Sequence, residues 1–207
     1  MSRRRDRIPM PVTLALPAEP PSKDEIDAIL IAADGIAGQA GRSGLTLVLA
    51  GSRSKRVLEK DWHHLEGYGG LSHLTNEVIG TKVDWCIHRG WLRIEYEDGL
   101  PLLYLSEKGW DRVQKVWVER LLAQFEEWAA NRDLWLQVWS RLENVHRTIK
   151  LQLLDRIVEE ERRDLAPVMA VWFRFEVRKM RAAINDALER LGFVRLSHPK
   201  DHPVRSN

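Results

Sequence analysis

Residues 75–109, TNEVIGTKVDWCIHRGWLRIEYEDGLPLLYLSEKG, decide the fold of this chain. Thr75 is a typical N-cap residue, and the apolar residues Ile79, Val83, Cys86 and Ile87 follow it at helical spacing, i, i+4, i+7 and i+8. Gly90 marks the end of this helix, because glycine is the usual residue after the last turn of a helix. The pattern therefore predicts an amphipathic helix that ends just before Gly90.

Two short strand-like runs follow this helix, Trp91–Tyr96 and Leu102–Leu105. They flank Glu97-Asp98-Gly99, and glycine at this place is typical of a β-hairpin turn. Helices followed by a hairpin predict a winged helix. The expected fold class is therefore mainly α with a small β-hairpin wing.

The sequence upstream begins as a basic, proline-rich segment and then becomes helical. Residues 1–21 include Arg3, Arg4, Arg5 and Arg7 together with five prolines, and we interpret them as a flexible arm that can add phosphate contacts. Ser22 and Glu25 form a capping box, which opens a helix over about 22–38. After a glycine-containing break comes a short apolar stretch, Leu45–Leu49.

Three long helices are predicted downstream of the hairpin. Ser106 caps the first, which runs to about Ala130; the second spans about Arg132–Arg162, and the third opens at Pro167 and ends before Gly192. Tight connections between long helices favour an antiparallel helical hairpin or bundle. The predicted domains are a basic arm (1–21), a winged helix (22–115), a helical domain (116–192) and a tail (193–207).

Composition narrows the classes of protein. The 207 residues carry a formal net charge of +2, so any nucleic-acid binding must come from a local patch. Cys86 is the single cysteine, which excludes an internal disulfide and a cysteine-based zinc cluster within one chain. No apolar run approaches the ~20 residues that span a bilayer. We expect a cytoplasmic protein with no membrane partner and no cofactor, and His198 and His202 offer too few ligands to predict a metal site.

One short segment, Gly51-Ser52-Arg53-Ser54-Lys55-Arg56, places two hydroxyls and three cations together. Phosphate oxygens accept hydrogen bonds from hydroxyl groups, guanidinium groups and exposed backbone amides, so this composition suits a DNA backbone. We predict DNA contacts from Ser52, Arg53, Ser54, Lys55 and Arg56. Charge clusters often only solvate a loop, and the residues alone leave that interpretation open.

A second contact zone is predicted in the loop from Tyr68 to Asn76 and in the helix after it. The candidates are Ser72, His73, Thr75, Asn76 and Lys82. Lys82 is the clearest cation on the exposed face of the predicted helix. Tyr96 or Leu100, near the wing tip, would be the residue that wedges between bases. The acidic neighbours Glu95, Glu97 and Asp98 argue against this role, because they would repel phosphates.

Four blocks of the sequence resemble the RQC domain, the winged helix that follows the motor in RecQ-family helicases. The first block runs from Gly44 to Arg56, and the run LAGSRSKRVL begins within it. The second block is Leu65-Glu66-Gly67-Tyr68-Gly69, and the third is W-C-I-H-R-G-W from Trp85 to Trp91. The fourth block is Leu105-Ser106-Glu107-Lys108-Gly109. The resemblance as a whole covers about residues 22–115, roughly half of the chain. The chain is similar to stand-alone bacterial RQC-minor DNA-binding proteins.

The resemblance implies a DNA-binding protein and not an enzyme. It implies that the segment around Ser52 and Arg56 grips the backbone of a duplex, a duplex end or a junction, in a role accessory to DNA repair, recombination or a helicase. The chain departs from the helicases in three respects. It has no G-x-x-x-x-G-K-[ST] phosphate loop, it lacks the four-cysteine zinc module, and its wing is acidic. We identify no catalytic or metal-ligand constellation.

The aromatic residues of the helical half leave a second function open. Trp110 and Trp117 are seven residues apart, as are Trp128 and Trp135, and Trp139 follows four residues later. This stripe predicts a packed seam, or an interface for a second copy of the chain or a helicase partner. The alternative function is a protein-interaction adaptor, in which the winged helix docks a protein and the helical hairpin dimerises.

Overall fold

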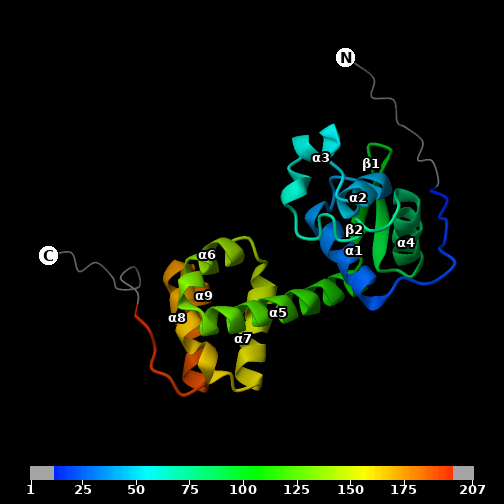
Figure 1. Ribbon diagram of the computed structural model, residues 1–207. Coiled ribbons are helices and arrows are strands. Elements are labelled where there is room, and N and C mark those ends of the chain that lie inside the picture. The colour runs from blue at the N-terminus through cyan, green and yellow to red at the C-terminus, as the bar shows by residue number, and fades with distance from the viewer. Residues whose placement is uncertain (1–11, 198–207) are drawn as a thin grey trace, which may run out of the picture. The chain divides into compact units, whose positions relative to one another are not determined.

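The computed structural model describes residues 12–197, which are mainly helical with one two-stranded hairpin (Figure 1). The chain divides into two compact units between Val113 and Gln114, which we call the winged-helix unit and the helical unit. The predicted fold class, a winged helix followed by a helical region, is confirmed. The arginines of the arm and the histidines of the tail lie outside the described residues. Within the described range, no helix has the length and apolar character needed to cross a membrane.

The winged-helix unit opens with α1 (Lys23–Gly35), whose start is fixed by the predicted capping box. The Glu25 amide donates to Ser22 Oγ at 3.2 Å, and the Ser22 amide donates to Glu25 Oε2 at 2.7 Å. Ile29 and Ala33 on this helix are fully buried. The helix ends about a turn earlier than the sequence pattern predicts.

The apolar stretch after the glycine-containing break is a helix, α2 (Arg42–Leu49). Its inward face is completely buried at Leu45, Val48 and Leu49. A short helix, α3 (Lys55–Glu59), and a 3₁₀ turn, η1 (Trp62–His64), follow it. The basic segment of the sequence therefore connects α2 to α3 and includes the first turn of α3.

The helix that decides the fold is α4 (Asn76–His88), and it packs against α2. Thr75 caps it as predicted, because the Val78 amide donates to Thr75 Oγ1 at 3.4 Å. Gly90 takes a φ of 69° beyond the last turn, a left-handed conformation that glycine adopts without strain. Ile79 and Val83 are fully buried, as the helical spacing predicts.

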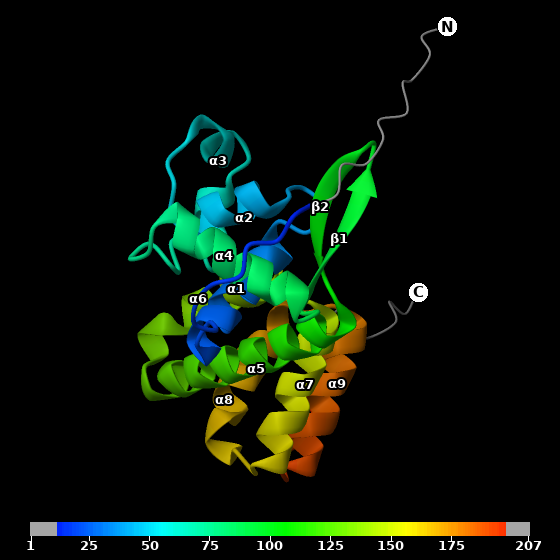
Figure 2. The same ribbon diagram turned by 90° about the vertical axis from the view of Figure 1, so that its right-hand side faces the viewer.

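The wing consists of β1 (Leu92–Glu97) and β2 (Leu100–Leu105), paired antiparallel (Figure 2). Asp98 and Gly99 connect them with φ angles of 49° and 78°. A two-residue turn with positive φ at both positions is type I′, which matches the twist of a hairpin. The Asp-Gly pair therefore sets the register in which Glu97 lies opposite Leu100.

The base of the wing is bonded to the connection between α1 and α2. The Leu103 amide donates to the Ala40 carbonyl at 2.9 Å, and the Gly38 amide donates to the Leu103 carbonyl at 3.2 Å. β2 is thus paired with β1 along one edge and bonded to residues 38–40 along the other, at Leu103, which is itself fully buried. These bonds join the wing to the connection between α1 and α2, within the winged-helix unit.

The segment that precedes α1 is bonded to the winged-helix unit at Thr13 and Ala15. Nη1 of Arg42 donates to the Thr13 carbonyl at 3.1 Å, and Nη2 pairs with Asp84 of α4. Asp84 also accepts the Ala15 amide at 2.8 Å, and its side chain is fully buried. The buried carboxylate therefore holds the segment that precedes α1. Pro21 at the end of this segment is buried as well.

The helical unit contains most of α5 (Glu107–Ala130) and the elements that follow it. The predicted helix over 132–162 and the predicted helix from Pro167 are both interrupted, and this corrects the expectation of three long helices. The elements are η2 (Arg132–Leu136), α6 (Gln137–Leu142), α7 (Arg147–Glu159), η3 (Arg163–Leu165), α8 (Ala166–Phe175) and α9 (Arg178–Arg190).

Each interruption has a polar side chain at its centre. His146 caps α7, since its Nδ1 accepts the Thr148 amide at 3.3 Å. At the corner between α8 and α9, the carboxylate of Glu176 is buried and accepts from Lys150 Nζ at 2.5 Å and from Trp172 Nε1 at 2.8 Å. The apolar periodicity continues through both interruptions, so it could not reveal them.

The tryptophan stripe is in part a packed core. The Trp128 ring is fully buried, with its centroid 5.4 Å from that of Phe125, and Phe125 lies 5.7 Å from Trp172. Trp135 Nε1 donates to the Trp128 carbonyl at 2.8 Å. Trp139, in contrast, is 43% exposed. The stripe is therefore fully buried at Trp128, partly buried at Trp110 and Trp117, and exposed at Trp139 of α6.

We expect Arg42→Ala to lower the free energy of unfolding by about 2 kcal/mol near neutral pH, because it leaves a buried carboxylate without its cation. Burial raises the pKa of Asp84 above its ordinary value of 3.8, against the lowering effects of the Ala15 amide and of Arg42. The folded state therefore takes up this proton at a higher pH than the unfolded chain does. Protonation of Asp84 therefore adds to the free energy of unfolding at acid pH. This contribution is lost as the pH rises through the pKa that Asp84 has in the folded protein.

Removing Arg42 raises the pKa of Asp84 further, so the defect should shrink as the pH falls towards about 4.5. Urea unfolding of both proteins at the two pH values measures this difference. Lys55→Ala, which removes an exposed pair with Glu59, is the control and should change stability little at either pH. A defect of Arg42→Ala that is the same at both pH values would contradict the role given to Asp84.

Candidate nucleic-acid interface

The basic segment leaves α2 through a tightly bonded turn. Gly51 has a φ of 68°, its amide donates to the Val48 carbonyl at 3.0 Å, and the Ser52 amide donates to the Leu47 carbonyl at 3.0 Å. The Tyr68 hydroxyl lies 2.8 Å from the Gly51 carbonyl oxygen and 3.0 Å from that of Ser52. The start of the basic segment is therefore held by bonds from both α2 and the loop that follows η1.

The two serines of the segment lie inside this turn. Ser52 Oγ accepts the Ser54 amide at 3.2 Å, which shapes the backbone before α3. Ser54 precedes the first residue of α3, and its own Oγ is shielded from solvent with no hydrogen-bond partner within the described part of the chain. Ser52 therefore has a structural role here, whereas Ser54 retains an uncommitted hydroxyl.

The three cations of the segment have different surroundings. Arg53 is exposed and forms no ion pair within residues 12–197. Lys55 is also exposed and lies 3.6 Å from Glu59 in a weak i,i+4 pair. The Arg56 guanidinium lies over the Trp62 ring, 5.5 Å from its centroid. Within the same described range, Arg53 and Arg56 are consequently the cations of this segment without a carboxylate partner.

The second predicted contact zone lies beside the first. The Gly69 amide donates to the Val48 carbonyl and the Leu71 amide to the Leu49 carbonyl, both at 2.9 Å. A Cβ atom on Gly51 would lie 3.9 Å from Ser72 Cβ, so Ser72 is a close neighbour of the basic segment. Ser72 and His73 are exposed. The structure therefore brings the two zones together, and their contacts with DNA remain predictions.

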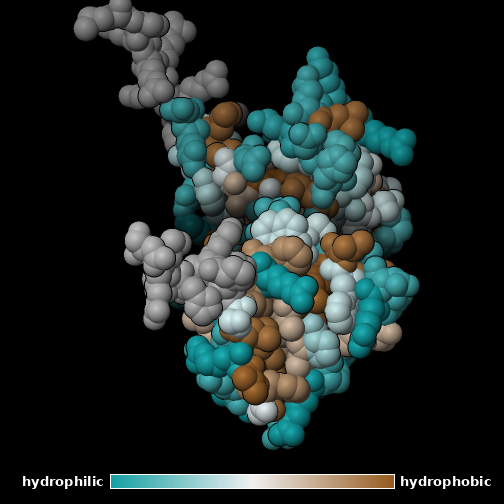
Figure 3. Space-filling model, turned by 90° about the vertical axis from the view of Figure 1, so that its left-hand side faces the viewer, coloured by the Kyte–Doolittle hydropathy of each residue, from teal (hydrophilic) through white to brown (hydrophobic). Residues whose placement is uncertain are grey.

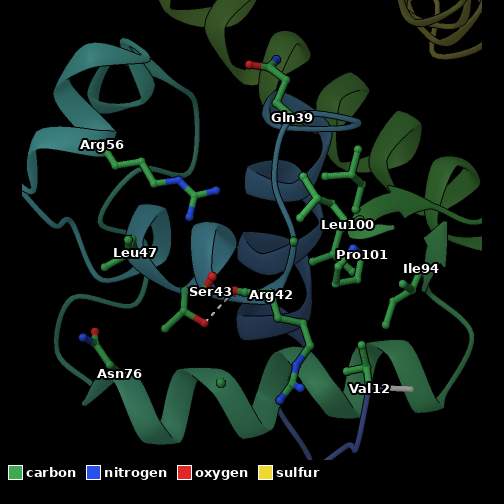
Figure 4. Close-up of a pocket in the computed structure, with 15 residues that line it drawn as sticks. Val12, Gln39, Arg42, Ser43, Leu47, Arg56, Asn76, Ile94, Leu100 and Pro101 are labelled. Atoms are coloured by element: carbon green, nitrogen blue, oxygen red, sulfur yellow. Dashed lines mark hydrogen bonds between the residues drawn. The ribbon is translucent and has the colours of Figure 1, made fainter. Parts of the chain in front are cut away.

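A cavity of about 750 Å³ opens between α2, α3, α4 and the wing (Figure 4). Figure 4 shows the Arg56 side chain reaching into it, and Asn76 lies on its wall at the start of α4. The wing closes the opposite side. Polar side chains that the sequence analysis missed, namely Gln39, Arg42 and Ser43, line it as well. Arg56 and Asn76, from separate zones of the sequence, thus belong to one concave surface.

Two of the predicted site residues, Lys82 and Thr75, have other roles in the structure. Lys82 is not the exposed cation that the sequence indicates, since its side chain is 13% exposed and its Nζ lies 2.8 Å from Glu25 Oε2. Burial raises the pKa of Glu25, but the bonds from Lys82 and Ser22 outweigh it, so this pKa lies below its ordinary value. Thr75 uses its hydroxyl to cap α4, and Tyr96 is 38% exposed on the wing.

The acidic residues of the wing are largely engaged by neighbours. Glu95 pairs with Arg93 on the same strand, and the Tyr104 hydroxyl donates to Glu97 across the hairpin. The bond to Glu97 raises the pKa of Tyr104. Asp98 at the turn is exposed. Of these three acidic residues, Glu95 alone is paired with a cation within the described part of the chain.

Two of the missed residues have signals in the sequence. Tyr68 belongs to the Leu65–Gly69 block, and its hydroxyl proves to hold the Gly51 turn. Arg42 stands directly after Gly41 at the start of an apolar run, where a cation opposes the helix dipole and so suggests a separate partner. That partner, Asp84, could not be found from sequence spacing.

Comparison with known proteins agrees with this geometry. The family model described as the RQC domain matches residues 23–120, from the start of α1 into α5. The chain contains an RQC domain. The ATP-dependent DNA helicase RecQ of Bacillus subtilis (strain 168) is 36% identical over 70 residues, which are 33% of this chain and 12% of the helicase. No solved structure matches the chain at a significant level.

The RQC domain is a non-catalytic domain, and its presence indicates nucleic-acid binding or a role accessory to a helicase. The match places the basic segment, the Tyr68 loop, α4 and the wing inside the domain, so the candidate interface belongs wholly to it. One cluster of metal-ligand residue types, Asp61, His63 and His64, also lies within the domain. Cys86 is buried, which raises its pKa to about 12 and keeps it a thiol.

Removing the Tyr68 hydroxyl should loosen the base of the basic segment. We expect Tyr68→Phe to lower the free energy of unfolding by about 1 kcal/mol, because the carbonyls of Gly51 and Ser52 lose a donor. Chemical denaturation measures this change. Tyr104→Phe removes an exposed hydroxyl instead and should have a smaller effect; equal effects would contradict the special role of Tyr68.

Proposed function

We propose that the RQC domain of this chain binds duplex DNA, a duplex end or a junction, through phosphate contacts made by the basic segment. The observation that carries the proposal is the anchoring of the Gly69–Asn76 loop to the end of α2 by backbone bonds, next to Ser52–Arg56 and beside one concave surface. A phosphate group needs donors held at fixed positions, and this turn holds them. Arg53 and Arg56 supply the charge.

The same residues favour phosphate recognition over base recognition. Lys82, which would have extended the positive surface along α4, is committed to Glu25. Glu77 is exposed in the first turn of α4, where a helix that reads base edges would present donors. Affinity should therefore come from backbone charge and shape, with weak sequence preference.

The relationship to the RQC domain supports a nucleic-acid partner. The relative from Bacillus subtilis is named an ATP-dependent DNA helicase, and it shares with this chain a stretch of only 70 residues. We infer that this chain acts beside DNA-processing enzymes in repair or recombination. Strand separation by the wing is a further proposal, for which Tyr96 is the exposed aromatic near the tip.

A second candidate function rests on the helical unit, which exposes apolar side chains (Figure 3). Leu136 is 92% exposed, and Trp139 and Phe175 lie with their ring centroids 5.8 Å apart while both remain substantially exposed. Val177 follows at the α8–α9 corner and is exposed too. We propose that this surface binds a protein partner, a second copy of the chain or a helicase, so that the chain also serves as an adaptor.

Charge reversal at the basic segment tests the DNA-binding proposal. We expect Arg53→Glu/Arg56→Glu to abolish salt-sensitive binding to labelled duplex, forked and single-stranded DNA, measured by fluorescence anisotropy. The matched control is Lys115→Glu/Arg163→Glu, which makes the same change of net charge at exposed positions of the helical unit. Equal loss of affinity in both variants would show that overall charge, and not the segment, governs binding.

The salt dependence of DNA binding by the wild-type protein gives the number of phosphates that the interface neutralises. If the interface neutralises about four phosphates, the logarithm of the association constant should fall with the logarithm of the salt concentration with a slope of about −3.6. Anisotropy titrations over a series of salt concentrations give this slope. A flat response would rule out a phosphate clamp.

Gly80 tests whether DNA approaches the cavity. It lies on α4 and lines the cavity, and a Cβ atom added there would meet nothing within 4 Å. Gly80→Ala should therefore raise the free energy of unfolding by up to about 1 kcal/mol, through helix propensity, and leave DNA affinity unchanged. Gly80→Glu should remain folded but bind DNA several-fold more weakly, because its carboxylate repels phosphate. Unchanged affinity in Gly80→Glu would place the DNA path elsewhere.

A further inference from the structure

Three side chains of metal-ligand type gather at the end of α3. Asp61, His63 and His64 each offer one ligand atom, and these three atoms lie within 4.8 Å of one another. None of the three side chains forms an ion pair or a hydrogen bond within residues 12–197. The cluster plays no part in the phosphate interface described above, and its residues remain available for another ligand.

The local backbone explains how neighbouring residues come to face one another. Asp61 has a left-handed conformation with a φ of 55°, which is uncommon outside glycine and tolerated best by Asp and Asn. The His64 amide then donates to the Asp61 carbonyl at 3.1 Å and closes a 3₁₀ turn. In such a turn residues i and i+3 lie one above the other. Asp61 and His64 therefore share one side of η1.

The turn is anchored from within. Trp62 is 2% exposed, and its indole nitrogen lies 3.5 Å from Gln39 Oε1. The two imidazole rings on the following residues lie with their centroids 3.8 Å apart and their planes inclined at 44°. A buried tryptophan thus fixes the backbone from which His63 and His64 project, so the cluster does not depend on a freely moving loop.

His63 carries an independent sign of a missing ligand. Its Nδ1 atom is shielded from solvent and has no hydrogen-bond partner within the described part of the chain. A buried polar nitrogen left without a partner destabilises the folded state, because it has lost its hydrogen bonds to water. Coordination of a metal ion at Nδ1 itself would give this nitrogen a partner.

The donor set selects the class of ion. Two imidazoles and one carboxylate suit Zn²⁺, Cu²⁺ and their neighbours, whereas Mg²⁺ and Ca²⁺ prefer oxygen ligands. Ligand atoms at the corners of a tetrahedral site with bonds of about 2.1 Å lie about 3.4 Å apart. The ligand atoms of the cluster, which are separated by no more than 4.8 Å, would need only side-chain rotations of modest size to reach this spacing.

We propose that Asp61, His63 and His64 form a site for a divalent first-row transition ion, and that Zn²⁺ is the principal ion bound there. Three protein ligands leave a coordination position for water or a further group. The ion would fix the turn from Asp61 through η1, which closely follows the short helix that carries Arg56. The proposal goes beyond DNA binding and stands whether or not the chain binds DNA.

The test is isothermal titration of the full chain with ZnCl₂ at neutral pH, after removal of bound metal with a chelator. We expect one saturable equivalent in the wild type. His64→Ala changes an exposed residue and should weaken binding at least about tenfold, and Asp61→Asn should weaken it as well. Far-ultraviolet circular dichroism checks that each variant is folded.

Two controls separate this site from other histidines. His88→Ala removes an exposed imidazole at the end of α4, and His198→Ala/His202→Ala removes those of the tail; both variants should bind Zn²⁺ as the wild type does. Co²⁺ serves as a second probe, because the visible spectrum of the bound ion should change in Asp61→Asn. Absence of saturable binding, unchanged binding in His64→Ala, or loss of binding in the tail variant would each overturn the proposal.

Discussion

α2 ends where it does because Gly51 takes a left-handed conformation, and that single turn organises the interface. A Cβ atom on Gly51 would lie 3.2 Å from Gly69 Cα, so the two glycines let two backbone segments approach closely. The approach allows the Gly69 and Leu71 amides to bond to carbonyls at the end of α2. Tyr68 then reaches the carbonyl of Gly51. The cations that follow and the loop before α4 are positioned by the same set of contacts.

The elements that could be predicted from the sequence are those whose signals are local. The Thr75 cap, the helical spacing of α4 and the Asp98-Gly99 turn each lie within a few residues of the structure that they specify. The prediction for Lys82 is wrong because its partner Glu25 is 57 positions away along the chain. The helix α2 gives no clear signal, since a helix of eight residues between glycines shows little periodicity. Pairings across a long stretch of chain leave no periodic trace.

At the candidate site, too, the residue types can be read from the sequence, whereas the geometry cannot. The residue types of the basic segment indicate a phosphate ligand, but the cavity arises from α2, α3, α4 and the wing together. The histidine cluster is hidden in the sequence for a related reason. Consecutive residues of an extended chain point to opposite sides, and only the left-handed Asp61 and the 3₁₀ turn bring His63 and His64 to one place. In the helical unit, the buried carboxylate of Glu176 divides α8 from α9 although the apolar pattern is continuous.

The bonds at the base of the wing have a mechanical consequence. Leu103 is held to Gly38 and Ala40, and Gly109 has no room for a side chain because a Cβ atom would fall 2.1 Å from the Trp91 carbonyl oxygen. The hairpin is thus attached to the rest of the winged-helix unit near Leu103, whereas Asp98 at its turn is exposed. A force applied to this turn would therefore act through Leu103 on the linker before α2, where Arg42 pairs with the buried Asp84.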